Sequence, residues 1–139
     1  MSTLRGASRD GDTKRVKELL DDGAPVDEKD YDGRTALMEA SQERHTEVAS
    51  EEGRTEVVKL LLDKGASIDE KDEGGMTALM YASNRGLTEV VKLLLDKGAL
   101  LDEKDEHGRT ALRRASEYGH TEVVQLLLDK GAPVDEKDK

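Results

Sequence analysis

Histidine is the side chain best suited to bind metals and move protons near neutral pH, and the chain has three: His45, His107 and His120. His107 is the best metal candidate, because Asp105 and Glu106 directly precede it. No second histidine lies at the paired spacing that zinc sites use. His45 and His120 each precede the same Thr-Glu-Val triplet, which indicates a repeated structural position. We therefore predict no metal site and no cofactor.

The other side chains with catalytic potential also lack a defined pattern. Asp and Glu total 32, but no two of them are marked for opposed acid and base roles. Gly74 and Gly75 do not lie between a strand and a helix, so they do not predict a phosphate-binding loop. The leucine triplets recur with the period of a buried helix face, which indicates core packing. The sequence predicts a protein that is not an enzyme.

Composition narrows the function further. The formal net charge of −10 argues against nucleic acid, because phosphate recognition needs a basic surface. The chain has no cysteine, and its apolar runs of at most five residues are far shorter than the roughly 20 that a membrane span needs. No charged and apolar leader precedes the first repeat. We expect a soluble cytoplasmic protein, with neither a membrane nor nucleic acid among its partners.

One segment, TEVVKLLLDKGA, organises the chain: it occupies Thr88–Ala99 and, letter for letter, Thr55–Ala66. It recurs at 121–132 with Gln125 in place of a lysine, and in a degraded form at 13–24. The glycines that close the four copies lie 42, 33 and 33 residues apart, and they are Gly23, Gly65, Gly98 and Gly131. A fixed period near 33 residues is typical of a solenoid.

Two helices are expected in each unit. The repeated segment is an amphipathic helix, and we expect Thr13 to cap its first copy. Another helix precedes it in the later units, after a capping threonine at Thr35, Thr77 or Thr110. An apolar residue, the tag Asp-Glu-Lys-Asp and a glycine turn connect the units. At the roughly 10 Å spacing of packed helices, the stacked tags would form acidic ladders with lysines interleaved.

The full pattern is Asp-x-x-Gly-x-Thr-Ala-Leu-x-x-Ala-Ser-x-x-Gly-x-Thr-Glu-Val-Val-x-Leu-Leu-Leu-Asp-Lys-Gly-Ala, and residues 72–101 and 105–134 match it nearly throughout. It resembles the ankyrin repeat, with Thr-Ala-Leu-Met or Thr-Ala-Leu-Arg where that family usually has Thr-Pro-Leu-His. The resemblance implies an all-α solenoid in which β-turn loops join stacked pairs of antiparallel helices. The near-identity of the repeats favours a consensus-like or engineered protein, and a recent natural duplication is the alternative.

We divide the chain into four units within a single domain, 1–139. Residues 1–29 form an N-terminal capping repeat, because Arg15 and Glu18 stand among its apolar positions. Residues 30–71 form a second repeat that contains a nine-residue tandem duplication. A third repeat covers 72–104, and a C-terminal repeat covers 105–139.

The duplication is visible as ASQERHTEV at 40–48 followed by ASEEGRTEV at 49–57. The glycine that ends the first helix in other repeats is Arg44 in the first copy and Gly53 in the second. We therefore expect the first helix to run past Arg44 to about residue 51, with a break before Gly53 and residues 44–54 protruding. A straightened helix here would also permit repeats to be exchanged between two chains.

Positions that vary between repeats are the candidates for binding, and the resemblance implies that they line a concave surface that contacts another protein. Aromatic residues often anchor such interfaces. The candidate residues are Tyr31, Asp32, Arg34, Met38, Gln42, Glu43, Glu73, Met76, Met80, Tyr81, Asn84, Arg85, His107, Arg109, Arg113, Glu117 and Tyr118.

The last repeat keeps the interior apolar pattern in 123–128, and no polar-faced repeat follows it in this sequence. Exposed apolar faces favour association, so we expect self-association through this repeat. The predicted function is a non-enzymatic protein–protein interaction module. The alternative is an engineered array without a natural partner, which carries the duplication to test how the array accommodates an insertion.

Overall fold

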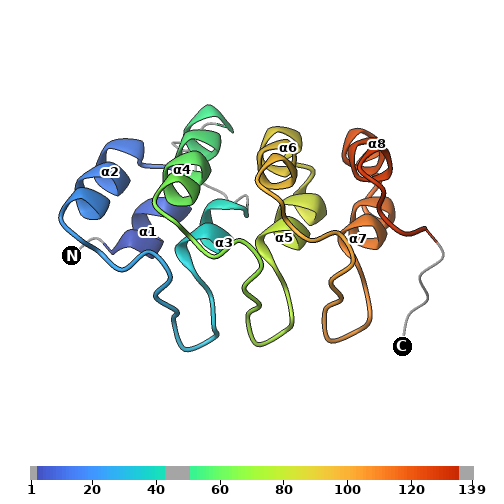
Figure 1. The fold of residues 1–139 in the computed structure, drawn as a ribbon, viewed down its shortest axis with the longest axis horizontal. Helices are drawn as coiled ribbons and strands as arrows, with labels where there is room; N and C mark the ends of the chain where they lie inside the picture. The colour runs from blue at the N-terminus through green and yellow to red at the C-terminus, as the bar shows by residue number, and fades with distance from the viewer. Residues whose placement is uncertain (1–2, 43–50, 135–139) are drawn as a thin grey trace.

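The computed structural model describes residues 3–42 and 51–134, and within these ranges it contains eight helices and no strand. The helices are α1 (Leu4–Arg9), α2 (Thr13–Asp21), α3 (Ala36–Ala40), α4 (Glu51–Asp63), α5 (Ala78–Arg85), α6 (Thr88–Asp96), α7 (Ala111–Glu117) and α8 (Thr121–Asp129). They form consecutive pairs that stack side by side along one axis (Figure 1). This is the predicted all-α solenoid.

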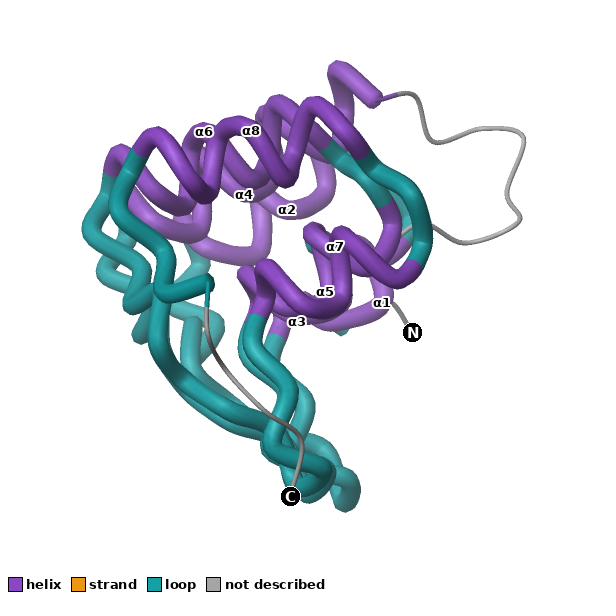
Figure 2. The backbone as a smooth tube through the Cα atoms, turned by 90° about the vertical axis from the view of Figure 1, so that its right-hand side faces the viewer, coloured by secondary structure: helices purple, strands orange, loops and turns teal. Residues whose placement is uncertain are grey.

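The helices form two layers, and the connecting loops extend from one of them. Helices α1, α3, α5 and α7 make the inner layer, and α2, α4, α6 and α8 make the outer layer (Figure 2). The loops between successive pairs project together beside the inner layer, which gives the array an L-shaped cross-section. The inner helices and these loops therefore border one concave face.

Local capping explains where the helices begin. The hydroxyls of Thr35, Thr77 and Thr110 accept hydrogen bonds from the backbone N–H three residues later, at 3.2–3.3 Å, as the sequence predicted. In α2 the prediction was wrong by one residue. Asp12 is the cap, because its carboxylate accepts from the N–H of Arg15 at 3.1 Å.

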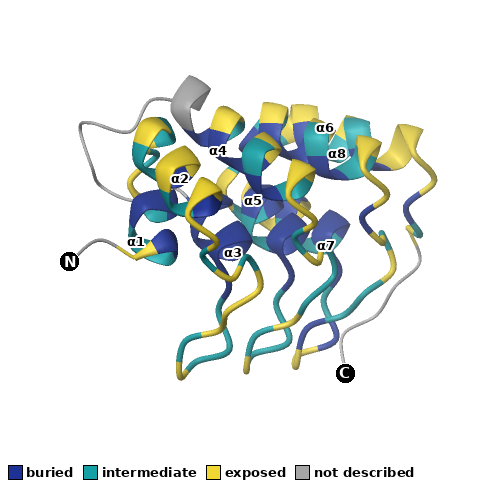
Figure 3. Ribbon diagram, turned by 60° about the vertical axis from the view of Figure 1, so that its left-hand side comes forward, coloured by how far each residue is buried: buried dark blue, intermediate teal, exposed yellow. Residues whose placement is uncertain are grey.

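Apolar side chains of the inner and outer helices form a single core that runs through the whole stack. Leu61, Leu94 and Leu127 occupy the same position in three successive repeats, and each is 0% exposed. The buried sides face neighbouring helices, whereas the exposed residues lie on the outer edges of the stack (Figure 3). Each repeat is too thin to bury these side chains alone, so adjacent repeats cover one another.

The duplication changes the lengths of two helices and leaves the core register intact. Helix α3 ends at Ala40 with Ser41 as its C-cap, so the predicted extension past Arg44 is wrong. Helix α4 begins at Glu51 and has 13 residues, compared with nine in α6 and α8. Gly53 therefore lies inside a helix. The predicted protrusion falls largely on residues 43–50, which lie outside the described residues.

Long-range packing fixes the position of α4. Val57 and Val58 are 0% exposed, as are the equivalent Val90 and Val91 of the next repeat. Arg54 is 2% exposed and donates from Nη1 to the carbonyl oxygen of Gln42 at 2.5 Å, which ties the start of α4 to the end of α3. Because α3 stops at Ala40, the continuous helix that the repeat-exchange hypothesis required is not formed.

The first repeat presents charge where later repeats present apolar side chains. Arg15 and Glu18 stand 42 residues before Val57 and Leu60, and they form an ion pair at 3.2 Å. Over the part of the chain that the structure describes, no helix is both long and apolar enough to cross a membrane.

Candidate functional site

The concave face is bordered by three loops of the same construction, at 30–34, 72–76 and 105–109. In each loop, Oδ1 of the first residue accepts two backbone N–H groups, from the residues two and four positions later, at 2.8–3.0 Å. Aspartate suits this position because its short carboxylate closes a turn on its own backbone. The three aspartates are Asp30, Asp72 and Asp105.

Adjacent loops contact each other through their backbones. The N–H of Glu73 donates to the carbonyl oxygen of Asp32 at 3.0 Å, and the N–H of Glu106 donates to that of Gly74 at 3.0 Å. Gly75 has φ +79°, and a Cβ there would lie 3.0 Å from the Cα of Asp105. The glycine is needed both for its conformation and for this close approach. The loops consequently form one continuous edge.

Charge pairs between repeats reinforce this edge. Lys29 Nζ lies 2.6 Å from Glu70 Oε1, and Lys71 Nζ lies 2.8 Å from Glu103 Oε1. Each lysine thus reaches the glutamate of the next tag, which confirms the predicted interleaving of lysines among acids. These side chains are partly exposed, so each pair contributes at most about 1 kcal/mol.

The second carboxylate oxygen of two loop aspartates binds the inner helix of the same repeat. The Tyr81 hydroxyl donates to Asp72 Oδ2, and the Arg114 guanidinium donates to Asp105 Oδ2 from Nε at 3.1 Å and also from Nη2. Tyr81 and Arg114 both lie nine residues after their aspartates. Glu39 holds this position in the second repeat and is 4% exposed. The contacts of Tyr81 and Arg114 therefore fasten the loops at 72–76 and 105–109 to the helices behind them.

These contacts shift the pKa values of Tyr81 and Asp105. Burial raises the pKa of Tyr81 to about 12, and its hydrogen bond to the Asp72 carboxylate and the negative charge of that carboxylate raise it in the same direction. Burial also acts to raise the pKa of Asp105, but the N–H of Arg109 and the Arg114 guanidinium stabilise the carboxylate and lower the pKa overall. At neutral pH the phenol is neutral and the aspartate is charged.

A second set of contacts connects repeats at the ends of the inner helices. His120 Nε2 lies 2.9 Å from the carbonyl oxygen of Asn84, and Arg114 Nη1 donates to Asn84 Oδ1 at 3.4 Å. The structural role predicted for His120 is confirmed, although its bond crosses to the preceding repeat. The Tyr118 ring stacks on His120, with centroids 6.5 Å apart. The equivalent His45 lies outside the described residues.

Thirteen of the predicted surface residues are exposed or half-buried. Six are exposed: Tyr31, Glu73, Arg85, His107, Glu117 and Tyr118. Seven are half-buried: Asp32, Arg34, Met76, Tyr81, Asn84, Arg109 and Arg113. Tyr31 is 90% exposed and Tyr118 is 59% exposed, whereas Tyr81 is used internally.

Three predicted surface residues are buried, which corrects the prediction for them. Met38 and Met80 are each 1% exposed, because inner helices within the stack have neighbours on both sides. Gln42 is 7% exposed, and Arg54 binds its carbonyl oxygen. Glu43 lies outside the described residues.

Arg114 was missed by the sequence prediction, although it connects a loop, its own helix and the preceding repeat. The available signal was a shared spacing: Arg114 lies nine residues after Asp105, just as Tyr81 lies nine residues after Asp72. Within residues 3–42 and 51–134, the acidic and histidine side chains form no cluster of three or more that could hold a metal ion.

Comparison with known proteins agrees with this geometry. A family model described as ankyrin repeats in three copies matches residues 2–72 and again residues 47–138. No curated protein matches the chain. The two matched segments together span nearly the whole sequence, and the paired helices and stacked loops are arranged accordingly. The chain belongs to the ankyrin repeat family.

Proposed function

We propose that this chain is a non-enzymatic protein–protein interaction module that binds its partner on the concave face. Ankyrin repeats generally mediate protein–protein interactions. The side chains that differ between repeats gather at the loops and inner helices, while the repeated side chains build the core. Variation on a constant frame is what permits one fold to recognise different partners.

The observation that carries the proposal is the exposure of two tyrosines on a rigid frame. Tyr31 occupies the tip of the first loop, and Tyr118 lies at the end of α7. Tyr118 rests on His120, which the carbonyl oxygen of Asn84 holds in place. An exposed aromatic ring that is already ordered loses little conformational freedom on binding, and such residues are frequent interface anchors.

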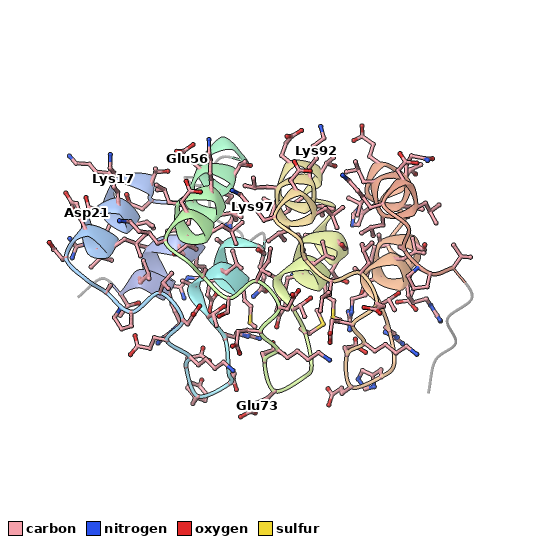
Figure 4. All side chains as sticks on the ribbon, viewed as in Figure 1. Lys17, Asp21, Glu56, Glu73, Lys92 and Lys97 are labelled. Carbon is pink, nitrogen blue, oxygen red and sulfur yellow. The ribbon has the colours of Figure 1, made fainter. Side chains whose placement is uncertain are left out.

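The outer helices provide a contrasting surface. Glu56 and Lys92 belong to the repeated segment and project away from the stack on α4 and α6, whereas Glu73 lies at a loop tip (Figure 4). Exposed charges of both signs keep a surface hydrated and are depleted from the centres of interfaces. The outer helices are therefore the appropriate control surface.

Site-specific photo-crosslinking tests the proposal in cell extract. A photoreactive amino acid is placed at Tyr118 in one variant and at Lys92 in a matched control. We expect a discrete crosslinked protein from position 118 and none from position 92, and we expect the double variant Tyr31→Ala, Tyr118→Ala to bind that protein at least tenfold more weakly. Equal crosslinking from Lys92, or unchanged affinity in the double variant, would contradict binding on the concave face.

A further inference from the structure

Ser67 carries a hydroxyl group at a position where the other repeats have none. The equivalent residues are Pro25, Leu100 and Pro133. Ser67 lies between the end of α4 and the loop at 72–76, and it is exposed. The other exposed serines and threonines among the described residues belong to helices or cap one, and they are Thr3, Ser116 and Thr121. Within residues 3–42 and 51–134, Ser67 is therefore the one exposed hydroxyl on irregular backbone.

The Ser67 side chain joins the second repeat to the first. Its Oγ donates to Asp27 Oδ2 at 3.0 Å, and its backbone N–H donates to Asp27 Oδ1 at 2.8 Å. One repeat later, the backbone N–H of Leu100 donates to Asp69 Oδ1 at 2.9 Å, and no hydroxyl takes part. The backbone contact alone thus joins those two repeats, so the Ser67 hydroxyl is an addition that the stack does not require.

Carboxylates follow Ser67 in the sequence, which reads Ser-Ile-Asp-Glu at 67–70. Ser67 is the only serine or threonine of the whole chain with an acidic residue three positions later. Protein kinases select substrates partly by such charge patterns, and acid-directed kinases bind carboxylates that follow the target hydroxyl. The exposed hydroxyl and the acidic residues after it are together the features that this class of enzyme recognises.

We propose that Ser67 is a phosphorylation site for an acid-directed serine kinase, and that its modification loosens the first repeat. The Ser67 oxygen attacks the γ-phosphorus of ATP, the bond from that phosphorus to the departing ADP breaks, and a carboxylate of the kinase takes the hydroxyl proton. The phosphoserine that forms has a charge of about −2 and no longer has the proton that Ser67 donated to Asp27.

The new charge lies beside an existing negative one, so repulsion between the phosphate and the Asp27 carboxylate replaces a hydrogen bond. Lys29, the cation nearest to Asp27 in the sequence, already pairs with Glu70 at 2.6 Å. Helix α1 packs against α3, and α2 packs against α4. Phosphorylation therefore weakens the contact between the first and second repeats, whereas α6 and α8 lie beyond it.

A kinase reaction on the folded full chain tests the site. The chain is incubated with ATP and an acid-directed serine kinase, and mass spectrometry locates the phosphate. Ser67→Ala removes the acceptor, and Glu70→Gln removes the carboxylate three residues after it. Glu103→Gln is the matched control, because Glu103 is the equivalent glutamate of the next repeat, where Leu100 stands in place of the serine. Circular dichroism establishes that every variant is folded.

Hydrogen exchange of the phosphorylated and unmodified chains then measures the effect on the stack. We expect one phosphate per chain, on Ser67, and none in Ser67→Ala. Incorporation should be at least about tenfold slower in Glu70→Gln and unchanged in Glu103→Gln. In the phosphorylated chain, the amides of α1 and α2 should exchange at least about tenfold faster, while those of α6 and α8 stay as they were.

Three results would overturn the proposal: no transfer to Ser67, transfer only after the chain is unfolded, or unchanged exchange in α1 and α2 after complete modification. None of these outcomes depends on recognition by the concave face.

Discussion

Replacing Leu94 by alanine should lower the free energy of unfolding by about 3 kcal/mol. Leu94 is 0% exposed, and α6 packs against α4, α5 and α8. Truncation removes buried methyl and methylene groups and leaves a cavity that helices on three sides cannot easily close, and such changes cost roughly 2–5 kcal/mol. A domain of this size has only about 5–15 kcal/mol of stability in total, so the effect is large.

Leu128→Ala is the matched control, because it makes the same chemical change on the last outer helix at a side chain that is 39% exposed. We expect it to cost roughly 1 kcal/mol or less, since most of the benefit of burial is absent there. Urea unfolding followed by helical circular dichroism measures both values from the transition midpoint and slope. Equal costs for the two variants, or a cost below about 1 kcal/mol at Leu94, would refute the claim that adjacent repeats enclose this position.

Three further predictions concern the contacts between loops and helices. Gly86→Ala should lower the free energy of unfolding by about 2 kcal/mol, because Gly86 has φ +70° and a Cβ there would lie 2.5 Å from the His120 ring. In a double-mutant cycle measured by thermal melts, adding His120→Ala should recover part of this loss. Tyr81, whose pKa is about 12, stabilises the fold in its neutral form, so its contribution to stability should be complete below pH 10 and be lost as the pH rises through 12. In Tyr81→Phe, stability measured as a function of alkaline pH should no longer show this loss. Asp105→Asn should lower the free energy of unfolding by about 3 kcal/mol at pH 7, since it leaves the Arg114 guanidinium without its charged partner. Because the pKa of Asp105 is lowered in the folded chain, urea unfolding should show this difference between variant and original shrinking as the pH falls below about 4.

Most of the fold could be predicted from the repeated sequence, because its residues form local contacts that are the same in each copy. A capping threonine needs only the N–H three residues later, so Thr35, Thr77 and Thr110 could be assigned from spacing alone. The same holds for the core leucines, whose helical period places them on one side. Asp12 competed with Thr13 for the cap of α2, and the carboxylate was better placed.

The path of the duplicated segment could not be predicted, because local helix propensity competed with packing against residues that are distant in the sequence. Helix propensity favoured continuation through Arg44, but α3 ends early, and the Ser41 hydroxyl bonds back to the carbonyl oxygen of Leu37 at 2.7 Å. The second copy instead joined α4, whose valines are buried between the helices of neighbouring repeats. Propensity is a weak preference, and the buried valines outweigh it.

Part of the candidate surface was misjudged for a related reason. Differences among Met38, Met80 and Arg113 were interpreted as exposure, but this position faces the next repeat and is buried wherever one follows. This position lies about 100° around the helix axis from the core leucine that precedes it in the sequence. An inner helix inside the stack is covered both on the side of that leucine and on the side of this position. Tyr31 and Tyr118 were predicted correctly as exposed, since they lie at a loop tip and a helix end.

Native-state hydrogen exchange tests most directly the claim that one uninterrupted stack carries the concave face across the duplication. We predict that the amides of Val57–Leu61 in α4 are as well protected as those of Val90–Leu94 in α6, because both segments bury equivalent valines and leucines between neighbours. The account would be contradicted if α4 exchanged together with α1 and α2 while α6 and α8 stayed protected, because the array would then be divided at the duplicated segment.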